Sequence, residues 1–196
     1  MKNFNTEYSG VELPAIECLK KLRWKYIKGD ELSPENSKER KSYKHVILKL
    51  KLSQSIKKIN PWISDDNLKS VVREIIQVKN LNLMEANKRI YEKFVDYISV
   101  EQDLGEGRKS YTVKIIDFDN LSNNEYIITN QFKVAGIIQN IVPDIVLFVN
   151  GIPLAVIECK SPFITNPMEA GINQILRYCN NRKPEENEGA EGLFYY

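Results

Sequence analysis

The stretch Val142–Pro162, VPDIVLFVNGIPLAVIECKSP, constrains the fold of this chain more than any other part of its sequence. Two apolar, β-branched runs flank Asn150-Gly151, a pair typical of a tight β-hairpin turn. The pattern therefore predicts two neighbouring antiparallel strands. The same stretch carries Asp144 near its start and Glu158 and Lys160 near its end. Charged groups between buried strands are unfavourable unless something pairs them or uses them.

The register of this hairpin decides whether these charges can meet. A two-residue loop at Asn150-Gly151 pairs Asp144 with Ile157, so that Asp144 faces away from Glu158. A three-residue loop with a left-handed residue, or a β-bulge, places Asp144 opposite Glu158 instead. A shared site therefore requires an odd loop or a bulge, and the sequence Asn-Gly-Ile-Pro is compatible with either.

Asp144, Glu158 and Lys160 together are typical of a divalent-metal site that acts on phosphate esters. Mg²⁺ prefers oxygen ligands and usually takes one or two carboxylates together with substrate phosphate and water. A neighbouring lysine can orient the nucleophile or neutralise negative charge in the transition state. Cys159 should point to the opposite face and pack in the core, which leaves its backbone carbonyl as a further metal ligand. The structural alternative is that Asp144 caps a strand while Glu158 and Lys160 form a plain ion pair.

The rest of the sequence predicts one α/β domain with an inserted helical region at about residues 43–101. A first helix, capped by Ser9 or Gly10, runs to about Leu22 and leads into a short strand in WKYIKGDEL. Ser64 is the expected N-cap of a helix in SDDNLKSVVREIIQV. Strands are expected in YTVKIIDF, NEYIITNQFKVA and the hairpin, followed by a helix in NPMEAGINQILRYCNN. GLFYY reads as the start of another strand, which suggests an N-terminal fragment of a longer chain.

Composition narrows the class of protein without identifying it. The net charge of +2 is too small to indicate nucleic-acid binding, and the basic run Lys38–Lys58 is most simply a solvated surface. The three cysteines have no metal-ligand spacing, which argues for a reducing compartment and against a zinc site. The N-terminus lacks the apolar segment of a signal peptide, and no apolar run approaches the ~20 residues that span a bilayer. We therefore expect a cytoplasmic protein without a membrane partner.

Several of these motifs resemble the PD-(D/E)xK nuclease superfamily, and within it the N-terminal nuclease domain of the restriction (R) subunit of type I restriction–modification enzymes. The resemblance rests on NQFKV, VPDIVLFVNGIPLAVIECKSP, NQILRY and GLFYY, and it is dense over Asn130–Tyr196. GVELPAIECLKKLRW is similar to the first helix of the family, whereas the helical middle agrees only in general character. The chain departs from the family at Val142, where many relatives carry Arg.

The resemblance implies a restriction-endonuclease-like core, in which helices flank a central mixed β-sheet, within a single domain over residues 1–196. It implies that Asp144 and Glu158 bind the catalytic metal together with the Cys159 carbonyl. Lys160 corresponds to the catalytic lysine of the family.

The resemblance also implies roles for residues outside the hairpin. Gln174 and Tyr178, one helical turn apart, correspond to the Q-x-x-x-Y pair that positions DNA or supports the active site. An acidic residue of the first helix completes the carboxylate cluster. Glu12 is the assigned residue, and Glu7 and Glu17 are the alternatives nearby.

The implied function is Mg²⁺-dependent cleavage of double-stranded DNA, with Mn²⁺ as a substitute, by the nuclease module of an ATP-dependent, translocating enzyme. The partners of such an enzyme are modification (M) and specificity (S) subunits. The sequence contains no G-x-x-x-x-G-K-(S/T) phosphate loop, so ATP is expected only in motor domains outside this chain. The alternatives are a stand-alone resolvase-like or repair nuclease and a non-catalytic docking module.

Overall fold

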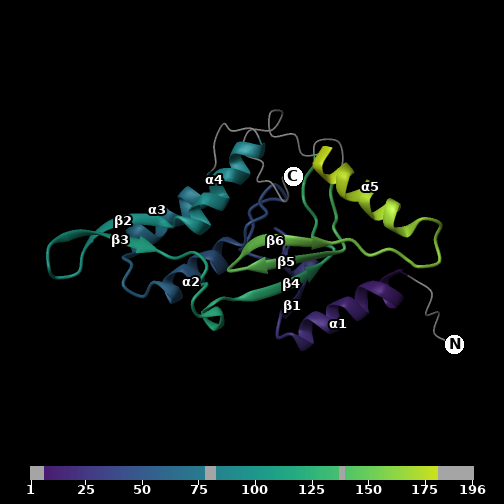
Figure 1. The fold of residues 1–196 in the computed structure, drawn as a ribbon, viewed down its shortest axis with the longest axis horizontal. Coiled ribbons are helices and arrows are strands. Elements are labelled where there is room, and N and C mark those ends of the chain that lie inside the picture. Colours follow the sequence, from purple (N-terminus) through teal and green to yellow (C-terminus); the bar gives the residue numbers. More distant parts are fainter. Residues whose placement is uncertain (1–6, 78–82, 137–139, 181–196) are drawn as a thin grey trace.

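The computed structural model describes residues 7–77, 83–136 and 140–180, except for the side chains of residues 83–87 and 179–180. Its centre is a four-stranded mixed sheet with the order β1-β4-β5-β6 (Figure 1). β1 (Lys25–Lys28) runs parallel to β4 (Tyr126–Asn130), whereas β5 (Ile145–Val149) is antiparallel to both β4 and β6 (Ile152–Ile157). This sheet and the helices around it confirm the mixed α/β class that the sequence predicts.

The first helix begins earlier than predicted. A π-helical turn, η1 (Tyr8–Glu12), continues directly into α1 (Leu13–Lys21), so the prediction that Ser9 or Gly10 caps the helix is wrong. Glu7 already has helical backbone angles, and its carboxylate accepts a hydrogen bond from the backbone N–H of Ser161.

The strand predicted in WKYIKGDEL ends at Lys28 and gives way to the 3₁₀ turn η2 (Gly29–Leu32). Gly29 lies so close to the end of β4 that a Cβ atom there would lie 2.2 Å from the Asn130 carbonyl oxygen. Only glycine permits this approach, which brings η2 against the end of the central strand.

Three helices form the helical region: α2 (Lys49–Ile59), α3 (Asp65–Ile76) and α4 (Leu83–Val95). Ser64 is the N-cap of α3, as predicted, and its side chain accepts a hydrogen bond of 3.3 Å from the backbone N–H of Asn67. The segment VILKLKL, in which apolar residues alternate as they would in a strand, is helical from Lys49 onward.

The predicted helical range 43–101 is wrong at both ends. After a left-handed residue, Tyr97, the chain forms β2 (Ile98–Asp103), which pairs with β3 (Arg108–Val113) in a ribbon that projects beside α3 (Figure 1). Before α2, the guanidinium of Arg40 donates hydrogen bonds to the carbonyls of Tyr43 and His45. The Tyr43 carbonyl also accepts a 2.9 Å hydrogen bond from the backbone N–H of Ala135, so a distant segment holds it in place of a helical hydrogen bond.

Two predicted strands are shorter than expected. The strand in YTVKIIDF stops at Val113, because the backbone N–H and C=O of Lys114 bond to the side chain of Asn60 instead of to another strand. The strand in NEYIITNQFKVA stops at Asn130, because Gln131 adopts a left-handed conformation with φ of 52°. The predicted helix near the C-terminus is α5 (Pro167–Asn180), and GLFYY lies outside the described residues.

The sheet is covered on both faces. Neighbouring residues of a strand point to opposite faces, and Ile127 and Ile128 accordingly belong to separate buried clusters. Ile127 packs in the large cluster that includes α2 and α3, whereas Ile128 packs with Ile16 of α1 and with Ile145. Full burial of each such side chain contributes roughly 1.5–3 kcal/mol to stability. These two layers fix the ends of β4, β5 and β6, where the predicted charges lie.

Candidate active site

The hairpin contains a β-bulge, which is one of the two arrangements that a shared site requires. Its loop is the two-residue Asn150-Gly151 turn, and both residues have positive φ, 52° and 81°. Beyond Pro153 the pairing shifts, so that Leu154 has no partner in β5. Pairing of Ile145 with Ile157 at the far end then sets the next residues, Asp144 and Glu158, opposite each other.

The turn is held in place by contacts on both of its sides. The side-chain amide of Asn150 donates to the Ile115 carbonyl and to Asn124 Oδ1, each at 2.8 Å. On the other side, the Gly151 carbonyl accepts a 2.8 Å hydrogen bond from the N–H of Leu48. A Cβ atom on Gly151 would lie 2.6 Å from the Leu48 carbonyl oxygen, so this contact requires glycine as well.

The ammonium group of Lys160 contacts both carboxylates of the hairpin. Its Nζ lies 3.5 Å from Glu158 Oε2 and 3.7 Å from Asp144 Oδ2, and it donates a 2.8 Å hydrogen bond to the Cys159 carbonyl. Asp144 Oδ2 also accepts a 2.8 Å hydrogen bond from the Cys159 N–H. The Cys159 side chain packs in the buried cluster beneath α1, as predicted.

Glu158 is a buried carboxylate whose surroundings disfavour its charged form. Its side chain is 2% exposed, and burial, with the nearby charge of Asp144, raises its pKa from 4.5 to about 7. The hydroxyl of Tyr178 and the charge of Lys160 oppose that rise. Oε1 of Glu158 is one of the few buried side-chain oxygens in the described part of the chain without a hydrogen-bond partner. An unsatisfied buried carboxylate oxygen is available to a ligand.

Two of the three acidic candidates in the first helix reach the cluster. Glu12 is buried, its Oε1 accepts a 2.9 Å hydrogen bond from Asn130, and its Oε2 lies 3.4 Å from Gln131 Nε2. Burial raises the pKa of Glu12, and the charges of Asp144 and Glu7 add to that rise. Glu12 therefore lies in the electrostatic field of the hairpin carboxylates.

Glu7 reaches the cluster from its other side. Its Oε1 lies 3.6 Å from Lys160 Nζ, while its Oε2 accepts the 3.0 Å hydrogen bond from the Ser161 N–H. Glu17 is exposed and pairs with Lys20 at 2.7 Å. The structure thus brings Glu12 and Glu7 to the site and leaves Glu17 on the surface.

Gln174 and Tyr178 lie on one side of α5 and anchor it to the start of β5. The Gln174 amide donates a 2.6 Å hydrogen bond to the Tyr178 hydroxyl, which donates to the Val142 carbonyl at 3.2 Å. Burial raises the pKa of Tyr178, so the hydroxyl keeps the proton that it donates. The contact at Val142 is made by its backbone, so it does not depend on the side chain by which the chain departs from the family.

The donor atoms of this site fit a hard divalent cation. Asp144, Glu158, the Cys159 carbonyl and Glu12 supply oxygen, the ligand type that Mg²⁺ and Mn²⁺ prefer. Among the described residues, no group of three or more His, Cys, Asp and Glu side chains is arranged to hold a metal ion by itself. A cation held here would therefore need water and substrate phosphate to complete its coordination.

The sequence analysis did not single out three residues that touch these carboxylates: Asn130, Gln131 and Ser161. Asn130 and Gln131 contact Glu12, and Gln131 Nε2 also lies 3.3 Å from Asp144 Oδ1. A signal was present, since two consecutive amide side chains directly follow the apolar strand NEYIIT. Polar residues that end a buried strand are candidates for a site at the sheet edge.

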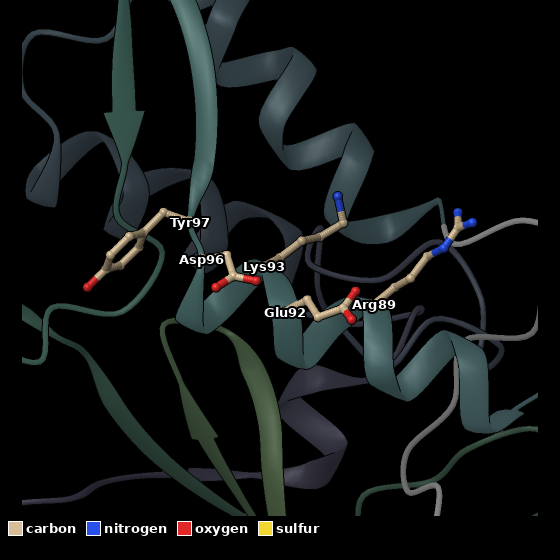
Figure 2. A pocket seen from close by; sticks show the side chains of 5 residues that line it. All are labelled: Arg89, Glu92, Lys93, Asp96 and Tyr97. Atoms are coloured by element: carbon tan, nitrogen blue, oxygen red, sulfur yellow. The ribbon is translucent and has the colours of Figure 1, made fainter.

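A pocket of about 250 Å³ lies on α4 and the residues that follow it (Figure 2). It is lined by Arg89, Glu92, Lys93, Asp96 and Tyr97. Its charges have both signs, and Lys93 forms an ion pair with Glu74 of α3. None of these residues belongs to β5, β6 or α5, so this pocket is separate from the carboxylate cluster.

Comparison with known proteins identifies the family of this chain. The family model described as "Type I restriction enzyme R protein N terminus" matches residues 5–196. The chain belongs to this family. The match extends over the first helix, the helical region and the carboxylate hairpin, and so includes the middle segment, where motifs alone gave only general similarity.

The R protein N-terminal family includes curated relatives from two organisms. The putative type I restriction enzyme MjaIXP endonuclease subunit of Methanocaldococcus jannaschii is 38% identical over 155 residues, which are 78% of this chain and 15% of that protein. The HindI endonuclease subunit of Haemophilus influenzae is 29% identical over 188 residues, 95% of this chain and 17% of that protein. The chain thus spans about a sixth of the length of these relatives. No helix among the described residues is both long and apolar enough to cross a membrane.

Proposed function

We propose that this chain is the DNA-cleaving module of a type I restriction enzyme R subunit, and that its sheet and helices form a restriction-endonuclease-like core. It hydrolyses phosphodiester bonds of double-stranded DNA with Mg²⁺, or with Mn²⁺ in its place. The observation that carries the proposal is the bulge that sets Asp144 opposite Glu158, with Lys160 between them. The endonuclease subunits among its relatives support the same conclusion.

Each group of the site has a defined task in this proposal. Asp144, Glu158, the Cys159 carbonyl and Glu12 would hold the cation, which would supply polarisation of the phosphate and a bound water of lowered pKa. The partnerless Oε1 of Glu158 is one atom available for that contact. Lys160, fixed by its bond to the Cys159 carbonyl, orients the attacking water or stabilises negative charge on the phosphate.

Gln174 and Tyr178 act on the site indirectly in this mechanism. Their hydrogen-bonded pair holds α5 against the Val142 carbonyl, two residues before Asp144. They keep the start of β5 in the position that the carboxylate cluster requires, at the side from which DNA approaches.

The parent enzyme has further parts in this proposal. It works in the cytoplasm with M and S subunits, the S subunit selects the DNA sequence, and motor domains elsewhere in the R subunit use ATP for translocation. We expect Lys160→Ala in the complete enzyme to abolish DNA cleavage while ATP hydrolysis persists. Lys20→Ala is the matched control, because Lys20 makes only a surface ion pair. Cleavage at the parental rate by Lys160→Ala would refute the role of this lysine.

Calorimetric binding of Mn²⁺ to this chain tests the metal site directly. We expect Asp144→Asn and Glu158→Gln each to lose binding, whereas Glu17→Gln, which alters an exposed carboxylate of α1, retains parental affinity. A non-catalytic docking module predicts no metal binding in any of them. Equal binding by the parent and both hairpin variants would show that the metal lies elsewhere.

A further inference from the structure

We propose that Asn130 and Gln131 are positioning residues that hold the carboxylates of Glu12 and Asp144 toward one shared cation. The inference rests on the proposed metal-dependent function and adds two residues to its machinery. Neither amide is assigned a metal contact; both act through the carboxylates that they bind.

Gln131 bridges the two carboxylates with a single nitrogen. Its Nε2 lies 3.4 Å from Glu12 Oε2 and 3.3 Å from Asp144 Oδ1. An amide nitrogen carries two hydrogens, so one can be directed at each carboxylate. The backbone N–H of Gln131 also donates a 3.0 Å hydrogen bond to the Asp144 carbonyl, which ties the main chain of the two residues together.

Asn130 fixes the other oxygen of Glu12. Its Nδ2 donates a 2.9 Å hydrogen bond to Glu12 Oε1, while its Oδ1 accepts a 2.8 Å hydrogen bond from the Tyr26 hydroxyl. Because a carboxylate only accepts hydrogen bonds, Glu12 faces the amide nitrogen of Asn130, and the amide oxygen is left to accept from the Tyr26 hydroxyl. Both oxygens of the Glu12 carboxylate are therefore oriented by neighbouring residues of one strand end.

The backbone of Gln131 has an uncommon conformation that lets its side chain reach Glu12. Consecutive side chains in a strand point to opposite faces, so Asn130 and Gln131 could not both reach Glu12 from a regular strand. Gln131 has φ of 52°, a left-handed conformation that is uncommon outside glycine. This turn redirects the Gln131 side chain to the same carboxylate, and the close approach of Gly29 to the Asn130 carbonyl packs β4 at that end.

Such an arrangement does more than satisfy a buried carboxylate. Asn130 alone would supply Glu12 with one charge-assisted hydrogen bond. The bridge by Gln131 sets the position of Glu12, in η1, relative to Asp144, which directly precedes β5. Partners of this kind orient metal-binding carboxylates, and their loss typically lowers metal affinity or activity about 10–100-fold.

Three variants test the bridge by calorimetric Mn²⁺ binding and by thermal unfolding. Gln131→Met keeps the length of the side chain and removes both N–H donors. Gln131→Asn keeps an amide and suits the left-handed backbone better, but it is one methylene too short to span both carboxylates. Gln54→Met is the matched control, since Gln54 is exposed on α2, away from the site.

We expect about 10–100-fold weaker Mn²⁺ binding by Gln131→Met and Gln131→Asn, with melting temperatures close to that of the parent. Gln54→Met should match the parent in both measurements. If Gln131 had a purely structural role, Gln131→Asn would bind Mn²⁺ as the parent does, because asparagine adopts the left-handed conformation more readily than glutamine.

Parental Mn²⁺ affinity in Gln131→Met would overturn the inference. The Asp144→Asn variant separates this failure from failure of the proposed function. If Asp144→Asn loses binding while Gln131→Met does not, the metal site stands and only the positioning role is refuted. If the parent binds no Mn²⁺, or if Asp144→Asn binds as the parent does, the proposed metal site and this inference are refuted together.

Discussion

Replacement of Glu158 by Gln should stabilise the metal-free chain at alkaline pH. The Glu158 side chain is 2% exposed, Asp144 lies opposite it, and its Oε1 has no hydrogen-bond partner. The folded chain therefore holds this carboxylate in an environment that disfavours its charge. Glutamine has nearly the same shape and no charge, so Glu158→Gln removes the electrostatic penalty while most of the packing is kept.

The size and sign of the effect follow from the pKa. The pKa of Glu158 rises from 4.5 to about 7 on folding. Below about pH 4.5 Glu158 is protonated in both the folded and the unfolded chain, so it does not lower stability. As the pH rises through about 7, the unfolded chain ionises this group more readily than the folded chain, and the free energy of unfolding falls. Each tenfold change in the ionisation constant corresponds to about 1.4 kcal/mol, so the complete penalty is about 3 kcal/mol. About 2 kcal/mol of it develops between about pH 5.5 and about pH 8.

Urea unfolding in the presence of a chelator measures this difference. We expect the stability of Glu158→Gln relative to the parent to increase by about 2 kcal/mol between about pH 5.5 and about pH 8. Glu17→Gln, at an exposed carboxylate, should show no such trend. Saturating Mn²⁺ should stabilise the parent and not the Glu158→Gln variant. A relative stability that stays constant across this pH range would refute the reasoning, because it would mean that Glu158 ionises normally in the folded chain.

Three further measurements probe the hairpin and its charges. Deletion of Leu154 removes the unpaired residue of the bulge and leaves Asp144 opposite Glu158, so Mn²⁺ binding should persist; loss of binding would show that the bulge does more than set the register. Gly151→Ala should destabilise the chain by at least about 2 kcal/mol in urea unfolding, because φ is 81° and the new methyl group meets the Leu48 carbonyl; a smaller loss would mean that α2 yields easily. Mn²⁺ affinity should rise and proton release should fall between about pH 6 and about pH 8, as Glu158 loses its proton before the metal binds; calorimetry in buffers of different ionisation enthalpy measures both, and pH-independent binding would contradict the raised pKa.

The elements that the sequence predicted correctly are those with a strong local signal. The Ser64 cap, the two strands of the hairpin and the helix that begins at Pro167 are each encoded by neighbouring residues. Errors occurred where distant residues decide the outcome. The backbone N–H of Ala135 bonds to the Tyr43 carbonyl in a segment predicted to be helical, and the side chain of Asn60 ends the strand after Val113.

For the site, the sequence narrowed the choice but could not complete it. Strand alternation alone showed that Asp144 and Glu158 can lie opposite each other only if the hairpin has a loop with an odd number of residues or a bulge. Which of these occurs depends on how the turn packs, and the structure has a bulge at Leu154. Glu7 and Glu12 could not be separated from Glu17 by spacing, because contact with Ser161 or Asn130 is a tertiary property.

The charge balance of the cluster connects its stability to its proposed chemistry. Lys160 is the one cation within ionic contact of Asp144, Glu158 and Glu7 among the described residues, so negative charge at the site exceeds positive charge. Burial is the main cause of the raised pKa of Glu158, and the neighbouring charge of Asp144 adds to it. A divalent cation bound to the carboxylate would offset both effects and favour the ionised form. Glu158→Gln should therefore stabilise the metal-free chain at alkaline pH and abolish metal binding, in each case because it removes this one carboxylate charge.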